Sequence, residues 1–128
     1  MSRLKRLACC LALCLVSSAG SAEELVAEFR GAVSRNTTEF EVQGPWLLDW
    51  RITTEGGRDA AVEVSLERAG LGSHEGRVLT TKYPGNGVRL FEQSGRFYFR
   101  VDASLSNWHL KVIQLTEEEA ARYTPKTR

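Results

Sequence analysis

Apolar and polar residues alternate with a period of two along most of this sequence, and this pattern restricts its fold more than any other feature. The segment WLLDWRI at 46–52 has an apolar residue at every second position. The segments 38–43, 62–67, 97–102 and 108–112 repeat the alternation. A period of two is typical of β-strands that have one face in a core and the other in water. Trp46, Trp50 and Trp108 belong to the inward sets, so we expect all three in the core.

The alternating segments are short and are separated by residues that favour turns. We expect eight strands, at 24–31, 37–43, 46–52, 60–67, 77–82, 87–92, 95–103 and 106–115. Glycine and proline punctuate the connections, as in QGP at 43–45 and YPGNG at 83–87. The pattern therefore predicts an all-β protein, a single antiparallel β-sandwich. One helical signal follows the last strand, because Thr116 and Glu119 have the spacing of a capping box.

The first 22 residues have the three parts of a secretory signal peptide. Arg3, Lys5 and Arg6 precede an uncharged run at 7–16, and small residues occupy 17–22. That run is about half as long as a membrane-spanning helix requires, so we expect cleavage after Ala22 and no stable membrane insertion. The sequence thus predicts a periplasmic or secreted protein. Its β-sandwich domain would span 23–115, with a short helix and tail at 116–128.

Composition excludes several kinds of chemistry from the exported part. All three cysteines lie within the predicted signal peptide, so the domain would contain no disulfide. Removing the three basic residues of the signal leaves 14 basic against 16 acidic residues, and the net charge falls from +1 to −2. We therefore expect no nucleic-acid partner. The only two histidines, His74 and His109, have no further metal ligands at short spacing, and we expect no metal or cofactor.

The candidate interaction surface consists of residues that the alternation places opposite the inward set. Tyr98, Arg100 and Asp102 face outward on one predicted strand, and His109 and Lys111 do so on the next. If these two strands pair, the five side chains lie close together on one face. Arg89 and Phe91 are added as outward residues of the preceding strand. The alternative interpretation is a solvated sheet face with cross-strand ion pairs.

Three functions remain open. The first is a non-enzymatic binding or interaction module for a protein or glycan of the cell envelope, using the charged face or the loops 33–36, 54–59 and 83–86. These loops would share one end of the sandwich if the strands run in simple up-and-down order. The second is a small carbohydrate-binding domain with Tyr98 and Phe91 as exposed rings. The third is a hydrolase. The sequence has no Gly-x-Ser-x-Gly motif and no pair of carboxylates at a spacing that indicates glycoside hydrolysis, so we expect no catalytic residue.

Two groups of motifs, one at each end of the predicted domain, resemble a loose group of small, uncharacterised bacterial exported domains. The first runs from Phe-x-Gly through Thr-x-x-Phe to Gly-x-Trp-x-Leu-x-Trp, and the second joins Gly-x-Phe-Tyr to a tryptophan strand. The matching residues are Phe29, Gly31, Thr37, Phe40, Gly44, Trp46, Leu48, Trp50, Gly95, Phe97, Tyr98 and Trp108. The segment 55–92 is not matched. The resemblance implies a jelly-roll-like sandwich and supplies no catalytic residue.

Overall fold

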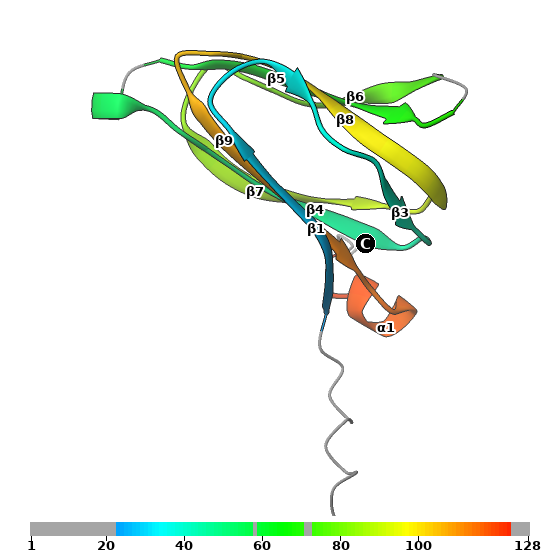
Figure 1. The fold of residues 1–128 in the computed structure, drawn as a ribbon. Coiled ribbons are helices and arrows are strands. Elements are labelled where there is room, and N and C mark those ends of the chain that lie inside the picture. The colour runs from blue at the N-terminus through cyan, green and yellow to red at the C-terminus, as the bar shows by residue number, and fades with distance from the viewer. Residues whose placement is uncertain (1–22, 58, 71–72, 124–128) are drawn as a thin grey trace, which may run out of the picture.

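The computed structural model describes residues 23–57, 59–70 and 73–123; the predicted signal peptide lies outside these ranges. Within them the chain forms two facing antiparallel sheets and one short helix (Figure 1). The elements are β1 (Glu24–Gly31), β2 (Arg35–Asn36), β3 (Phe40–Val42), β4 (Trp46–Thr53), β5 (Ala61–Arg68), β6 (His74–Thr81), β7 (Gly85–Phe91), β8 (Gly95–Ser104), β9 (Asn107–Gln114) and α1 (Glu117–Ala120), with a 3₁₀ turn at Glu55–Gly57.

Strand order defines the two sheets. Sheet A has the order β1-β9-β4-β7, and sheet B has the order β2-β8-β5-β6, with β3 also paired to β8. The chain changes sheet at every connection except those from β2 to β3 and from β5 to β6. Neighbours within a sheet are therefore mostly distant in sequence, which is the connectivity of a jelly roll. The predicted jelly-roll-like β-sandwich is confirmed.

The described residues contain nine strands, whereas eight were predicted, because the short strand β2 precedes the expected strand at 37–43, which is shortened to β3. The backbone N–H of Thr37 donates to the carbonyl oxygen of Phe99 at 2.9 Å. The N–H of Phe99 donates in return to the Thr37 hydroxyl oxygen at 3.0 Å rather than to a backbone carbonyl. A side-chain acceptor thus replaces one rung of the ladder at Thr37, and β2 and β3 pair with β8 as two separate short strands.

The inward residues of both sheets form one aromatic and aliphatic core. Trp46, Phe97, Phe99 and Trp108 are almost completely buried, as the alternation predicted. Phe40 lies between them, with its ring centroid 5.1 Å from that of Phe99. A core of this density accounts for a sandwich without any disulfide among the described residues.

The prediction that Phe91 is exposed is wrong. Phe91 is 6% exposed and its ring stacks on Trp46, with centroids 4.3 Å apart and planes at 14°. On β7 the inward face carries Arg89 and Phe91, whereas Val88 is exposed on the outer face and Leu90 packs there under the helix. The segment VRLFE has apolar residues of both parities, so the alternation did not decide its orientation.

Arg89 also departs from its predicted place on the outer face. Its guanidinium donates hydrogen bonds to the carbonyl oxygens of Arg77 and Val78, at 3.2 and 2.9 Å, and lies 5.2 Å from the centre of the Phe91 ring. These contacts join β7 of sheet A to β6 of sheet B. Arg89 therefore closes the open edge between the sheets, and this role accounts for its charge without a ligand.

The helix α1 covers one end of the outer face of sheet A (Figure 1). The alternation of segment 46–52 places Leu47 on the outer face, opposite Trp46 and Leu48, yet Leu47 is only 2% exposed because it packs against Leu115 and Ala120. The predicted capping box is confirmed: the Glu119 N–H donates to the Thr116 hydroxyl at 3.1 Å, and the Thr116 N–H donates to the Glu119 carboxylate at 2.9 Å. The helix is one turn long, from Glu117 to Ala120.

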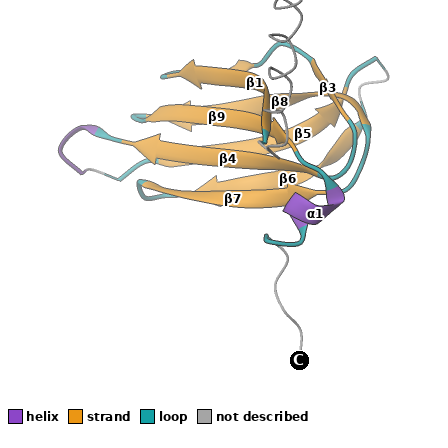
Figure 2. Ribbon diagram, turned by 90° about the horizontal axis from the view of Figure 1, so that it is seen from below, coloured by secondary structure: helices purple, strands orange, loops and turns teal. Residues whose placement is uncertain are grey.

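Four connections gather at one end of the sandwich, which we term the loop end (Figure 2). They are 32–34, 54–60, 82–84 and 105–106. The register places them together, because Gly31 pairs with Trp108, Thr53 with Asn107 and Ile52 with Gly85. The loops predicted to share one end thus do so, although jelly-roll order rather than up-and-down order is the reason.

Candidate functional site

The predicted interaction surface is divided between two opposite faces. The strands β8 and β9 do not pair, because β8 belongs to sheet B and β9 to sheet A. Tyr98, Arg100 and Asp102 therefore lie on the outer face of sheet B, whereas His109 and Lys111 lie on the outer face of sheet A. The short connection at 105–106 crosses between the sheets instead of closing a hairpin.

The outer face of sheet B contains a buried carboxylate with two polar partners. One oxygen of Glu67 accepts a hydrogen bond from the Ser65 hydroxyl at 3.1 Å and lies 2.9 Å from Nδ1 of His74. A serine nucleophile needs a histidine within hydrogen-bonding reach of its hydroxyl. Here the carboxylate stands between serine and histidine, so this trio is a structural network and not an activated nucleophile. Tyr98 pairs with Glu67 across the strands and is half-buried beside this network.

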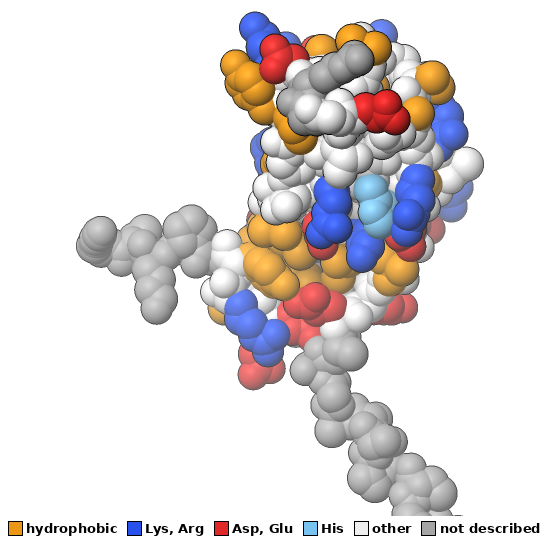
Figure 3. All heavy atoms as spheres, turned by 90° about the vertical axis from the view of Figure 1, so that its left-hand side faces the viewer, with side chains coloured by type: hydrophobic (Ala, Val, Ile, Leu, Met, Phe, Trp, Pro, Cys, Tyr) orange, Lys and Arg blue, Asp and Glu red, His pale blue; other side chains and the backbone are white. Residues whose placement is uncertain are grey.

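The outer face of sheet A carries two rows of charged side chains. The row nearer the loop end consists of Arg30 on β1, His109 on β9 and Arg51 on β4, which are direct cross-strand neighbours. The next row consists of Glu28, Lys111 and Asp49 on the same three strands. Figure 3 shows this face, where Lys and Arg side chains gather around a histidine. The first row contains no acidic group of its own and is the more cationic of the two.

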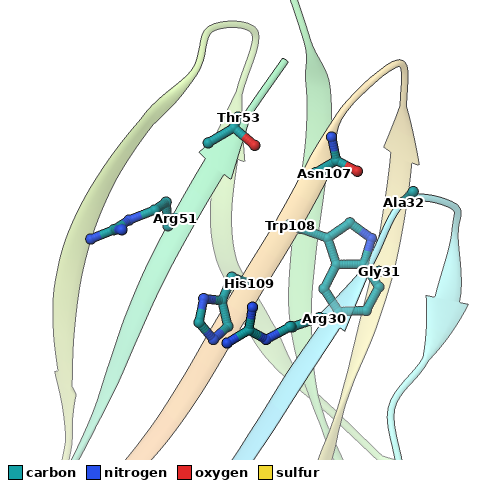
Figure 4. Close-up of a pocket in the computed structure, with 8 residues that line it drawn as sticks. All are labelled: Arg30, Gly31, Ala32, Arg51, Thr53, Asn107, Trp108 and His109. Atoms are coloured by element: carbon teal, nitrogen blue, oxygen red, sulfur yellow. The ribbon is translucent and has the colours of Figure 1, made fainter. Parts of the chain in front are cut away.

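A groove of about 580 Å³ opens over the first row and extends to the loop end. It is lined by Arg30, Gly31, Ala32, Arg51, Thr53, Asn107, Trp108 and His109 (Figure 4). Figure 4 shows Arg30 and His109 side by side, with Arg51 on the neighbouring strand and Thr53 and Asn107 nearer the loops. The central strand β9 supplies both a histidine and an amide to the groove, and β1 and β4 supply an arginine each.

The floor of the groove is held rigid by Trp108. Its ring is buried beneath β1, and its Nε1–H donates to the carbonyl oxygen of Val33 at 3.1 Å. The guanidinium of Arg35 lies 5.1 Å from the centre of the same ring. Gly31 faces Trp108 across the strands, and only a residue without a side chain leaves room for the indole there.

The charges of the two rows are unequally compensated. The carboxylate of Glu28 lies 2.5 Å from Nε2 of His109 and 3.1 Å from the Arg30 guanidinium. Its hydrogen bond with His109, and secondly that with Arg30, lowers the pKa of Glu28 below its usual value. Among the residues that the structure describes, neither Arg51 nor Lys111 has a side-chain hydrogen bond or ion pair. Arg51 therefore offers the groove a cation that forms no ion pair with a described residue, with the acidic Asp49 as its neighbour two residues earlier on the same face.

In the described ranges no group of three histidine, cysteine or acidic residues is placed to hold a metal ion. No described helix is long and apolar enough to cross a membrane.

The sequence alone pointed to only part of the groove. His109 was among the predicted site residues, whereas Arg30, Arg51, Thr53 and Asn107 were not. All five lie at the loop-end termini of β1, β4 and β9, yet these strands are far apart in the sequence. The five residues become neighbours only because β9 pairs with both β1 and β4. The period of the apolar residues predicts strands but not which strands pair.

No protein-family model matches the sequence, and no curated protein matches it. One similar solved structure is a carbohydrate-binding module from the lichenase 5A of Cellvibrio mixtus, in complex with cellotriose. The similarity covers 74% of this chain and 85% of that chain, at 15% identity and a TM-score of 0.35. A likeness this low carries no argument about the ligand of the present protein, which has to be inferred from its own groove.

Proposed function

We propose that this protein is a non-enzymatic binding module and that the groove on sheet A binds an anionic group of its ligand. The observation that carries the proposal is the row of Arg30, His109 and Arg51, which lines the groove from three adjacent strands. A guanidinium suits carboxylate or sulfate because it can donate two parallel hydrogen bonds to such a group, and that of Arg51 is not already paired as that of Arg30 is with Glu28. A volume of about 580 Å³ is within the range of ordinary ligand sites.

The position of the row on a rigid sheet supports binding rather than simple solvation. Each of the three side chains starts from a strand, and the buried Trp108 fixes the floor beneath them. Sites on strands hold their groups in place before the ligand arrives, which reduces the entropy lost on binding. Arg51 forms no ion pair within the described part of the chain, so a ligand would not have to displace one there.

The sequence also suggested a carbohydrate-binding domain that stacks its ligand on two exposed rings, Tyr98 and Phe91. The structure leaves only one of these rings partly exposed. Phe91 is buried against Trp46, and Tyr98 lies half-buried on the other sheet. A glycan could still be the ligand, but its recognition would rest on charge and hydrogen bonds rather than on stacking.

We also propose that the module is exported and that its leader is removed after Ala22. The support is the three-part sequence at 1–22 and the position of the first described strand, which begins at Glu24. Mass spectrometry of the protein from the envelope fraction of the native cells would give the mature N-terminus. Glu23 is the expected first residue; a mass that retains the leader would contradict export by this route.

Titration calorimetry with acidic and neutral hexasaccharides tests the binding proposal. We expect the acidic oligosaccharides to bind and maltohexaose not to bind, with affinity falling as salt is raised. Arg51→Gln should weaken binding about tenfold or more, because a charge-assisted hydrogen bond contributes about 1.5–3 kcal/mol.

Arg100→Gln is the matched control for that experiment. It makes the same change of charge on the outer face of sheet B, where Arg100 is exposed and has no side-chain partner among the described residues. Equal weakening by both variants would mean that only net charge matters. That result, or unchanged binding by Arg51→Gln, would overturn the assignment of the groove.

A further inference from the structure

A second pocket continues the groove over the loop end. It has a volume of about 300 Å³ and is lined by Ala32, Glu55, Leu105, Ser106 and Asn107. Ala32 and Asn107 also line the groove, so the two hollows meet at these residues. We term the second hollow the loop-end pocket. Because the hollows adjoin, one extended ligand can occupy both.

Ser106 has an unsatisfied hydroxyl in the wall of the loop-end pocket. The residue is 5% exposed, and its Oγ has no hydrogen-bond partner in the described structure. Native proteins rarely leave such a group unpaired, and an exception calls for a specific explanation such as a water or a ligand. A hydroxyl can both donate and accept, and rotation about χ1 changes its direction without moving the backbone. The Oγ is buried as the side chain stands, and once it rotates toward the pocket a ligand that carries hydroxyl groups would satisfy it.

Leu105 next to it has an unusual backbone and an unusual exposure. Its φ is 58°, in the left-handed region that a leucine rarely adopts, and its side chain is 73% exposed. Strained residues of this kind concentrate at ligand sites, where the strain fixes a needed geometry. Here the strain holds an apolar side chain at the rim of the loop-end pocket, where it can cover the carbon-bound face of a ligand.

The charge of the loop-end pocket is opposite to that of the groove. Glu55 is exposed at its wall and forms no ion pair with any described residue. Its carboxylate would repel a second anionic group but would accept hydrogen bonds from hydroxyl groups. Asn107, between the two hollows, can donate to one ligand unit and accept from the next.

We propose that the groove and the loop-end pocket bind two adjacent units of one glycan chain, an acidic unit over Arg51 and a neutral, hydroxyl-bearing unit beside Ser106 and Glu55. This inference rests on the proposed function, because it assumes that the groove takes the acidic unit. It adds a requirement that the ligand alternate in charge. A chain in which every unit is acidic places a carboxylate against Glu55 and binds less well.

Calorimetry with two acidic hexasaccharides tests whether the protein prefers a chain that alternates acidic and neutral units to a chain that is acidic at every unit. Hyaluronan alternates acidic and neutral units, whereas polygalacturonate is acidic at every unit. We expect hyaluronan to bind at least fivefold more tightly. Glu55→Gln should strengthen polygalacturonate binding and reduce that preference, whereas Glu92→Gln should leave it unchanged, because Glu92 is an exposed acid at the opposite end of the sandwich.

Leu105→Gly keeps the backbone geometry available and removes the apolar rim. It should weaken hyaluronan binding severalfold and leave polygalacturonate binding nearly unchanged. Near-ultraviolet circular dichroism would confirm that the variant is folded. If both acidic hexasaccharides bind equally and Glu55→Gln changes nothing, the two-unit inference fails and the proposed function stands. If neither binds, the proposed function fails as well. A hexaglutamate peptide that binds more tightly than both would overturn a glycan as the ligand.

Discussion

At the scale of single residues, the groove depends on the close approach of the Trp108 ring to the backbone of Gly31. Trp108 forms the floor only because the opposite position on β1 is glycine. A Cβ built on Gly31 would lie 2.4 Å from an atom of the Trp108 ring, which no packed side chain tolerates. Gly31 therefore allows the indole to be buried directly beneath β1 at the edge of the groove.

The first prediction concerns that contact. Gly31→Ala should destabilise the protein by about 1–3 kcal/mol, because the indole and its hydrogen bond to Val33 must shift. Urea denaturation would measure the change. Gly85→Ala is the matched control, since no atom lies within 4 Å of a Cβ at that position. A loss of stability as large in Gly85→Ala would show that glycine flexibility, rather than the approach of the ring, is responsible.

The second prediction concerns the pH dependence of stability. The pKa of Glu28 is lowered in the folded protein, first by its hydrogen bond with His109. A carboxylate with a lowered pKa stabilises the fold above its unfolded pKa and loses that effect as the pH falls through the folded value. The stability advantage of the native protein over Glu28→Gln should thus be present at pH 7 and shrink as the pH falls below 4.5, the usual pKa of this group.

Denaturation series at several pH values would test this dependence. Glu92→Gln serves as the control, because Glu92 is exposed and forms no ion pair with a described residue. A difference between the native protein and Glu28→Gln that stays constant across the acidic range would contradict the prediction.

Residue by residue, the alternation predicted the core where a strand had apolar residues on one parity only. Phe97 and Phe99 are inward and buried, as expected. The prediction failed at Phe91, because Leu90 beside it is also apolar and finds its own cover under α1. It failed at Leu47 for the same reason. The helix α1 buries Leu47 and partly buries Leu90, although it is distant from both in the sequence. The local alternation of apolar residues does not predict such a contact.

At the scale of elements, α1 is a short cover whose stability depends on its cap and its contacts. One turn of helix is too short to be stable alone. Its first orphan N–H groups are satisfied by the capping box of Thr116 and Glu119, and Ala120 packs on Leu47. The hydroxyl of Tyr123 donates to the carboxylate of Glu23 at 2.7 Å, which joins the end of the helical segment to the start of β1.

The third prediction tests the cap. Thr116→Ala should cost about 1 kcal/mol, since the Glu119 N–H loses its acceptor in the first turn. Chemical denaturation would report the loss, with Thr38→Ala as the control for removing an exposed threonine hydroxyl outside any strand or helix. An equal effect in the two variants would mean that the capping hydrogen bonds contribute nothing measurable.

At the scale of the whole molecule, the site and the fold differ in how far the sequence predicts them. Strand positions and the sandwich class follow from local patterns, so they were predicted closely, as for β1 and β4. The groove results from β9 lying between β1 and β4, and the predicted patch was divided because β8 and β9 lie in opposite sheets. Such pairings join segments far apart in the sequence, and no local spacing encodes them.

The two sheets share one continuous core, which contains both Trp46 of sheet A and Leu66 of sheet B. All three tryptophans of the chain lie on β4 and β9, so tryptophan fluorescence reports on sheet A and on its contacts with Phe40 and Phe97 of sheet B, whereas far-ultraviolet circular dichroism reports on the backbone of both sheets. Leu66 is 1% exposed, and Leu66→Ala should destabilise the fold by about 2–5 kcal/mol.

Because the core is shared, this change in sheet B should shift the midpoint seen by fluorescence as far as the midpoint seen by circular dichroism, which is the behaviour of a single cooperative unit. Leu48→Ala, a buried leucine of sheet A, provides the matched comparison. If Leu66→Ala left the fluorescence transition in place while the dichroism transition moved, the sheets would unfold separately. The groove on sheet A would then keep its form without sheet B. Coincident transitions would mean instead that every side chain of the groove depends on packing from both sheets.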